Sequence, residues 1–282
     1  MKSVPFEART FHWISSDGLK INAKDWYIAN PTAVIIILHG LGEHCGRYAH
    51  MASFFNQHQI AIVGYDRRGH GISDGKRGHT TSYQAYLDEV SELVKRTKEF
   101  YPDIPVFLYG HSMGGNIALN FVLQRKPNIA GLIATGPWIV LHQNPSSLLI
   151  AFAKVINTIF PSFTQSNGLN PNHISTVPAE VEKYKNDPLV HDRITSNTGL
   201  EMMKAATFLN SFNGDIPVPT LIMHGEDDKI VSVRGSRDFS KRVKGDINYK
   251  EWSGFYHEIQ NESNSAEVFE YTLRWIDKIL KV

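Results

Sequence analysis

The chain has 282 residues, 42% of them apolar, which is enough to bury one sizeable core as a single domain, 1–282. Its 29 basic and 28 acidic residues nearly cancel, which argues against a nucleic-acid partner, because such proteins concentrate positive charge. The single cysteine, Cys45, excludes an internal disulfide and fits a reducing compartment. The thirteen histidines are scattered without metal-ligand spacing, so we expect no metal.

The N-terminal residues, MKSVPFEARTFHW, contain no apolar segment typical of a secretory signal. No apolar run reaches the roughly 18 residues needed to span a bilayer. We therefore expect a cytoplasmic protein.

The first predicted element is an edge hairpin over 10–27, with Asp17-Gly18 at its turn. A continuous apolar run follows at 33–38, which is typical of a strand buried on both faces of a parallel sheet. The same pattern recurs at 60–65, 106–109, 129–135 and 220–224. Apolar residues at spacings of three and four predict helices over 83–97 and 268–279. This alternation predicts an open α/β sheet, with its site at the carboxyl ends of the strands.

The alternation breaks at about 138–200, which we interpret as a cap inserted over the strand ends. Within it, the stretch 148–160 is apolar almost all round, whereas a surface helix is normally polar on one face. Two interpretations stay open for this stretch. It is either a helix buried under the rest of the cap, or a lid that lines the substrate tunnel and makes transient contact with a membrane surface.

Residues 109–116, YGHSMGGN, place Ser112 between two glycines, with an apolar run before and a helical stretch after. This matches G-x-S-x-G, in which a nucleophilic serine lies on a sharp turn from strand to helix. Side chains two positions either side of such a serine would collide, which explains Gly110 and Gly114. A turn serine between strand and helix is the alternative.

A serine nucleophile needs a base and an orienting carboxylate, and in this fold the chain order is serine, acid, histidine. An acidic turn follows the predicted strand at 220–224, and its Asp228 lies where the turn would direct a carboxylate inward. Asp227 stays the alternative. His257 follows a later short strand and is the candidate base.

The remaining candidates follow from the same geometry. The backbone N–H of Met113, after the nucleophile, and that of Leu41, in the loop after strand 33–38, are the predicted oxyanion donors. Glu43 and Arg47 then follow in the same loop. They belong either to a solvated loop or to a polar pocket near the scissile bond.

Six segments together resemble the monoacylglycerol lipases of the α/β-hydrolase superfamily, over nearly the whole chain. They are HGLGEHCGRY (39–48), YDRRGHGISDGKRG (65–78), GHSMGG (110–115), YKNDPLVHD (184–192), HGEDDKIV (224–231) and GFYHEIQNE (254–262). The resemblance implies an eight-stranded, mostly parallel sheet under a mainly helical cap. It also implies hydrolysis of a monoacylglycerol, or a similar lipid ester, to an alcohol and a fatty acid, without a cofactor.

Carried over to this chain, the resemblance makes Ser112 the nucleophile, His257 the base and Asp228 the acid in preference to Asp227. It gives Leu41 and Met113 to the oxyanion hole, and Glu43 and Arg47 to the glycerol pocket. Two residues depart from the family pattern. They are Cys45, where serine is usual, and Gln260, where mammalian members place a histidine near the glycerol.

Three other functions stay open. Lysophospholipases and general carboxylesterases use the same triad and differ from monoacylglycerol lipases in the alcohol that leaves. A hydrolase fold that only binds its ligand is the remote alternative, because such proteins usually lack a triad residue. Epoxide hydrolases and dehalogenases carry an aspartate at the elbow, where this chain has Ser112.

Overall fold

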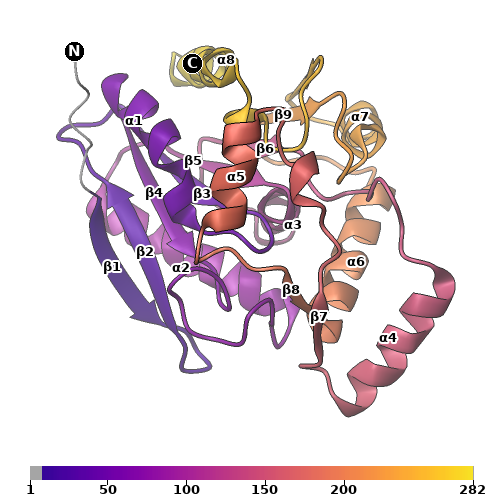
Figure 1. The fold of residues 1–282 in the computed structure, drawn as a ribbon. Helices are drawn as coiled ribbons and strands as arrows, with labels where there is room; N and C mark the ends of the chain where they lie inside the picture. The colour runs from indigo at the N-terminus through magenta and orange to yellow at the C-terminus, as the bar shows by residue number, and fades with distance from the viewer. Residues whose placement is uncertain (1–7, 282) are drawn as a thin grey trace.

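Eight strands form one mixed sheet in the computed structural model, which describes residues 8–281 (Figure 1). They are β1 (Arg9–Ile14), β2 (Lys20–Trp26), β3 (Ala33–Leu38), β4 (Ile60–Asp66), β5 (Val106–His111), β6 (Gly131–Thr135), β9 (Thr220–Gly225) and β10 (Ile247–Trp252). The order is β1-β2-β4-β3-β5-β6-β9-β10, and only the β1–β2 and β2–β4 pairs are antiparallel. The predicted α/β sheet and edge hairpin are confirmed. Residues 1–7 and 282 of the predicted domain lie outside the described residues.

Both faces of the sheet are covered, which explains the continuous apolar runs. Along β3, Val34 and Ile36 pack into one core, whereas Ile35 and Ile37 pack into the other, and all four are fully buried. One face carries α1 (Ala49–Gln57) and α8 (Ser265–Leu280), and the other carries α2 (Tyr83–Phe100), α3 (Met113–Arg125), α6 (Ser196–Ser211) and α7 (Val233–Arg242). A strand in such a sheet has no polar face, so period-two alternation is absent.

Helix α2 shows how the periodic pattern becomes packing. Its N-terminus is capped by the Ser82 hydroxyl, which accepts a hydrogen bond from the Ala85 N–H. Tyr86, Val90 and Leu93 recur on one face of the helix and are fully buried against the sheet. The predicted helix is therefore confirmed.

Strand β3 lies between β4 and β5 in the sheet. The chain passes from β3 to β4 on one side and then crosses back to β5 on the other, so the order of strands reverses at β3. Loops that leave the carboxyl ends of two such strands diverge, and the crevice between them is where α/β proteins place their sites. The loop after β3 and the turn after β5 therefore face each other across this crevice.

The segment between β6 and β9, which we call the cap after the prediction above, lies beside the sheet (Figure 1). It contains α4 (Ser147–Ile159), β7 (Thr164–Ser166), α5 (Pro178–Asn186) and β8 (Arg193–Thr195), and it leads into α6. The cap touches the loop after β3, where the His191 N–H donates to the Gly42 carbonyl at 2.8 Å. Gly42 has φ +80°, and a Cβ there would collide with the His191 carbonyl oxygen.

Helix α4 projects away from the sheet, at the lower right of Figure 1. None of its residues is buried, and Leu148, Phe152 and Val155 are 81%, 55% and 61% exposed. The interpretation of this stretch as a helix buried under the rest of the cap is therefore wrong. Its single charged residue is Lys154.

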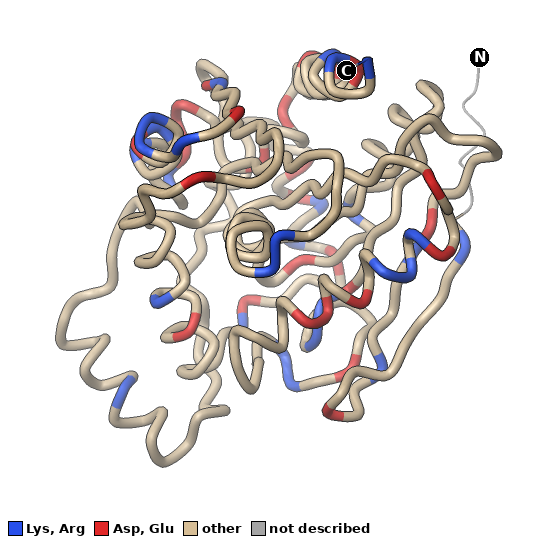
Figure 2. Tube along the Cα trace, turned by 180° about the vertical axis from the view of Figure 1, so that it is seen from behind, with Lys and Arg blue, Asp and Glu red and all other residues tan. Residues whose placement is uncertain are grey.

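Charges of both signs are interspersed along the trace seen from behind, in keeping with a net charge of +1 (Figure 2). Within residues 8–281, no helix combines the length and apolarity that crossing a bilayer requires.

Candidate active site

Ser112 lies at the junction of β5 and α3 in a strained conformation. Its φ and ψ are +54° and −116°, a region that residues other than glycine rarely occupy. Hydrogen bonds on both sides hold it there. The Ser112 N–H donates to the Thr135 carbonyl at 2.9 Å, and the Ser112 carbonyl accepts from Asn116 and Trp138 at 3.0 Å each. Strain held in this way is typical of a functional residue rather than of an ordinary turn serine.

The glycines that flank the serine are sterically required. A Cβ on Gly110 would lie 2.5 Å from the Gly114 carbonyl oxygen, and one on Gly114 would lie 2.6 Å from the His39 carbonyl oxygen. Real Cβ atoms do not approach backbone atoms so closely. The first turn of α3 can therefore pack against the end of β3 only if position 114 has no side chain.

Asp228 and His257 come from the loops after β9 and β10, and the structure brings them into contact. His257 Nδ1 donates to Asp228 Oδ2 at 2.6 Å. The other carboxylate oxygen, Oδ1, accepts from the backbone N–H groups of Ile230 at 2.7 Å and Val231 at 2.9 Å. Asp228 is buried, whereas Asp227 is exposed. The turn therefore directs Asp228 toward the histidine.

This contact sets the protonation states of both residues. Because His257 Nδ1 donates to a carboxylate, its Nε2 is left free to accept a proton. Burial lowers the pKa of His257, but the charge and hydrogen bond of Asp228 outweigh it and leave the pKa raised above 6.5. Burial would raise the pKa of Asp228, yet the neighbouring His257 and the hydrogen bonds to the carboxylate hold that pKa well below its usual range.

Both Ser112 and His257 lie near the segment at Gly136. Ser112 bonds to the residue before Gly136, and a Cβ on Gly136 would lie 3.2 Å from His257 Nδ1. The ring of His111 lies 4.7 Å from the His257 ring, centroid to centroid.

The two predicted oxyanion donors lie in segments next to Ser112 in the chain or in space. Met113 is the first residue of α3, so its N–H has no acceptor within the helix. Leu41 follows Gly40, and a Cβ on Gly40 would lie 3.4 Å from Ser112 Cβ, so this loop passes beside Ser112. The Gly40 N–H donates to Glu43 Oε1 at 2.5 Å, which holds the loop in place.

Glu43 and Arg47 form a buried ion network rather than a solvated loop. Arg47 Nη1 lies 2.6 Å from Glu43 Oε2, and its guanidinium makes two parallel bonds of 2.7 Å each to Glu258. The Tyr48 hydroxyl donates to Glu43 Oε1 at 2.8 Å. Burial would lower the pKa of Arg47, but the two carboxylates keep it well above its ordinary value. The solvated-loop interpretation is therefore wrong.

A cavity of about 860 Å³ opens beside this network, between the core and helix α5 of the cap. Its lining includes Arg47, Lys183 and Gln260. Both cations are already paired, because Arg47 bonds to Glu43 and Glu258, and Lys183 bonds to the neighbouring carboxylate of α5. Among the described residues, its lining therefore holds no lysine or arginine without a carboxylate partner. Of the predicted site residues, only Arg47 lines this cavity.

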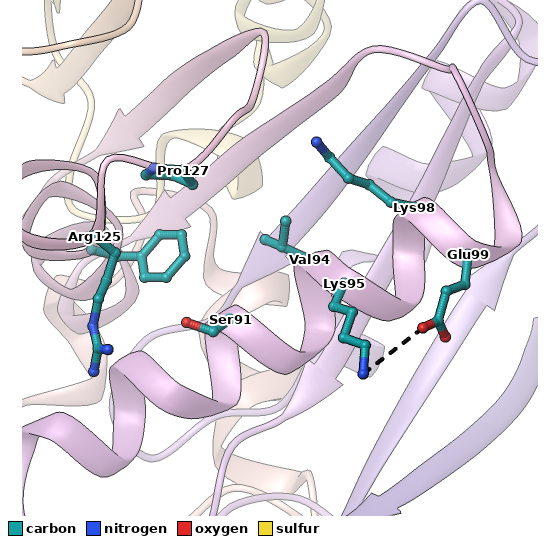
Figure 3. Close-up of a pocket in the computed structure, with 8 residues that line it drawn as sticks. Ser91, Val94, Lys95, Lys98, Glu99, Arg125 and Pro127 are labelled. Atoms are coloured by element: carbon teal, nitrogen blue, oxygen red, sulfur yellow. Dashed lines mark ion pairs between the residues drawn. The ribbon is translucent and has the colours of Figure 1, made fainter.

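A second hollow of about 560 Å³ lies outside α2, beside the end of α3 (Figure 3). Its cations are also paired. Lys95 lies 4.0 Å from Glu99, Lys98 donates to a backbone carbonyl, and Arg125 bonds to Asp88. None of the predicted site residues lines this groove, and it contributes nothing to the site.

The sequence reasoning missed two residues of this site. Glu258 is adjacent to His257 but pairs with Arg47, 211 positions away in the chain, and no local signal predicts that pairing. His224, at the end of β9, hydrogen bonds to Asp228 Oδ2 at 3.0 Å. The sequence shows His224 four residues before Asp228, but this spacing alone did not predict a contact between them.

The fold and this site together define an α/β hydrolase: a strained serine after β5, with an acid and a histidine after β9 and β10. A family model described as "Serine aminopeptidase, S33" matches residues 29–264, and the chain belongs to that family.

Several known proteins are similar to this chain. It is 30% identical over 249 residues to monoacylglycerol lipase of Mycolicibacterium smegmatis, covering 88% of this chain and 89% of that one. It is 32% identical over 258 residues to phospholipase YtpA of Bacillus subtilis, covering 90% and 99%. The solved structure of Paleococcus ferrophilus monoacylglycerol lipase superposes with a TM-score of 0.78 at 29% identity, covering 98% and 99%. The resemblance to monoacylglycerol lipases is thus confirmed.

An abhydrolase domain-containing protein of Dictyostelium discoideum is 36% identical over 267 residues, or 93% of this chain. The chain spans only 28% of the length of that relative.

Proposed function

We propose that this protein hydrolyses the ester bond of monoacylglycerols, releasing glycerol and a free fatty acid through an acyl-enzyme. The observation that carries the proposal is the contact of His257 Nδ1 with the buried Asp228, beside the strained Ser112. The similarity to monoacylglycerol lipases supports the choice of substrate.

The proposed reaction begins with the His257 base. Nε2 takes the proton of the Ser112 hydroxyl as Oγ attacks the ester carbonyl carbon. The N–H groups of Leu41 and Met113 donate to the oxyanion that forms. When the tetrahedral intermediate collapses, the bond to the glycerol oxygen breaks, and His257 gives its proton to that oxygen. Water then attacks the acyl-enzyme with His257 again as base, which releases the fatty acid and restores Ser112.

The pairing of charges around the cavity favours a neutral head group. Arg47 lines the cavity and bonds to Glu43, and we assign both to the glycerol pocket. Because neighbouring carboxylates already neutralise Arg47 and Lys183, the cavity offers no unpaired lysine or arginine for a phosphate. Glycerol needs only hydrogen bonds, whereas a phosphate bound without a counter-charge would be desolvated at high cost.

A lysophospholipase is the second candidate, because one relative named a phospholipase is 32% identical over 99% of its length. A general carboxylesterase with the same triad is the third. Both keep the roles of Ser112, Asp228 and His257 and change only the alcohol that leaves.

The exposed apolar surface of α4 supports transient contact with a lipid surface. Leu148, Phe152 and Val155 are exposed on a helix with a single charge, and Phe160 follows at 62% exposure. A contiguous apolar patch of this kind is rare on a protein that contacts only water. Each CH₂ of a lipid chain that is withdrawn from water contributes about 0.8 kcal/mol, so a membrane-facing cap also assists the transfer of substrate.

The test compares product release from three esters under identical conditions: a long-chain monoacylglycerol, the matching lysophosphatidylcholine and a short-chain chromogenic ester. Preference for the monoacylglycerol supports the proposal. Preference for the lysophospholipid supports the second candidate, a lysophospholipase. Turnover of the short ester alone identifies a general carboxylesterase, and turnover of none of the three rejects ester hydrolysis.

A further inference from the structure

His224 is a second imidazole on the carboxylate that orients the catalytic base. Its Nε2 lies 3.0 Å from Asp228 Oδ2, the same oxygen that accepts from His257 Nδ1 at 2.6 Å. Backbone N–H groups occupy the other oxygen, Oδ1. Asp228 therefore accepts four hydrogen bonds, which is the full capacity of a carboxylate.

The tautomer of His224 follows from its partners. Nε2 faces two acceptors, Asp228 Oδ2 and the Val231 carbonyl oxygen at 3.2 Å, so Nε2 must carry the hydrogen. Nδ1 faces the Ser236 hydroxyl of α7 at 2.8 Å, which can donate to it. His224 and Ser236 are both fully buried. A neutral imidazole satisfies every one of these contacts, and no charge is required.

The other charged groups around the two histidines are already accounted for. The ring of His111, which is neutral, lies 4.7 Å from that of His257, and the carboxylates Glu258 and Glu43, whose charges also act on His257, are both bonded to Arg47. Burial lowers the pKa of His111 to about 3. On the neighbouring strand β10, Glu251 lies in register with His224. Glu251 is held by two bonds of 2.7 Å to Arg237, so it does not compete for the imidazole.

We propose that His224 is a positioning residue for the reaction: as a neutral donor, it shares Asp228 Oδ2 with His257 and thereby sets the pH at which His257 becomes a base. The inference rests on the proposed function, because it assigns a role to a residue behind the proposed triad.

The physical reason is competition for one oxygen. A hydrogen bond from His224 stabilises the ionised carboxylate and withdraws electron density from Oδ2. Without that donor, the carboxylate would attract the His257 proton more strongly, and the histidine would hold its proton to higher pH. The carboxylate would also lose one of the four bonds that fix its orientation, so the imidazole would meet the serine less often in a productive geometry.

The experiment compares His224→Leu with His224→Gln, by kcat and KM for a short-chain ester and by the pH profile of kcat/KM. Leucine removes the donor, whereas the Gln Nε2 can occupy the position of the imidazole Nε2–H. For His224→Leu we expect kcat to fall about tenfold at unchanged KM, because the residue does not touch substrate. We expect the acid limb of the profile to move up by about half to one pH unit, the equivalent of one lost hydrogen bond. His224→Gln should restore both values.

Ser236→Ala provides a second readout if the leucine variant fails to fold. It removes the hydroxyl that fixes the His224 tautomer, so the acid limb should move in the same direction by a smaller amount. A leucine variant with the profile and kcat of the original enzyme would overturn the inference. Equal losses in the leucine and glutamine variants, with an unmoved profile, would also overturn it, because that is the behaviour of a residue needed only for packing.

Ser112→Ala separates the inference from the function on which it rests. If Ser112→Ala is inactive and the His224 variants behave like the original enzyme, only the role of His224 is wrong. If Ser112→Ala keeps its activity, the proposed function itself is wrong.

Discussion

Arg47 and Glu258 are joined by two parallel hydrogen bonds of 2.7 Å, which tie the loop after β3 to the residue next to His257. The same guanidinium also bonds to Glu43, which in turn accepts the Gly40 N–H of the oxyanion loop. One buried cation therefore holds together the two loops that carry the proposed oxyanion donor and the proposed base.

We expect Arg47→Met to lower the free energy of unfolding by about 3–5 kcal/mol, because it leaves Glu43 and Glu258 buried without their counter-charge. Urea unfolding at unchanged m-value measures this loss. The matched control is Arg237→Met, whose ion pair with Glu251 is partly exposed, at 37% and 24%. That change should cost less than about 1 kcal/mol. Equal losses in the two variants would contradict the buried network.

Ser112→Ala should reduce kcat by about 10³-fold or more, because the proposed acyl-enzyme could not form, while substrate still binds. Active-site labelling with a fluorophosphonate should be lost in parallel. Near-normal turnover in this variant would reject the nucleophile.

Activity should depend on pH through His257. The base must be neutral to accept the serine proton, and Asp228 raises its pKa above 6.5 once burial is outweighed. We therefore expect kcat/KM to fall as pH drops through a value above 6.5. In Asp228→Asn that limb should move to lower pH, with a large loss of kcat. An acid limb below 6.5 in the original enzyme would contradict the assigned geometry.

Gly114→Ala should inactivate the enzyme, because its Cβ would collide with backbone oxygens at the end of β3 and displace the first turn of α3. Gly199→Ala is the control, since it is also a helical glycine but its Cβ would contact only Ile194, at 3.8 Å. That change should stabilise the protein by about 0.5–1 kcal/mol through helix propensity. Activity and melting temperature, measured for both variants and the original protein, test the two expectations. Full activity in Gly114→Ala would show that the elbow has more room than the structure allows.

Polar substitution of the α4 surface should separate two kinds of substrate. Phe152→Ser with Val155→Ser should reduce hydrolysis of emulsified monoacylglycerol several-fold and leave a soluble short-chain ester unaffected, because only the first requires contact with a lipid surface. Phe100→Ser, at an apolar side chain 48% exposed on α2, is the control. Equal effects on both substrates, or an equal effect of the control, would argue against a membrane-facing cap.

The sequence alone determined much of this protein. The order of strands and helices, the hairpin and the turn at Ser112 follow from local features: apolar runs, helical spacing and glycines that a sharp turn requires. Local rules work for these elements because each depends on residues close together in the chain. The position of the acid was narrowed to two neighbours by the same reasoning.

Only the tertiary structure decided the rest. The residue pattern alone left Asp227 open beside Asp228, and the family resemblance preferred Asp228. The path of the folded turn, which periodicity does not encode, is what brings Asp228 to the histidine. The partner of Arg47 lies 211 residues away, and His224 joins the site through a carboxylate that packing places beside it. The exposure of α4 was also undecided, because an apolar helix looks the same in sequence whether a neighbour covers it or not. These contacts are made between side chains that only the folded chain brings together.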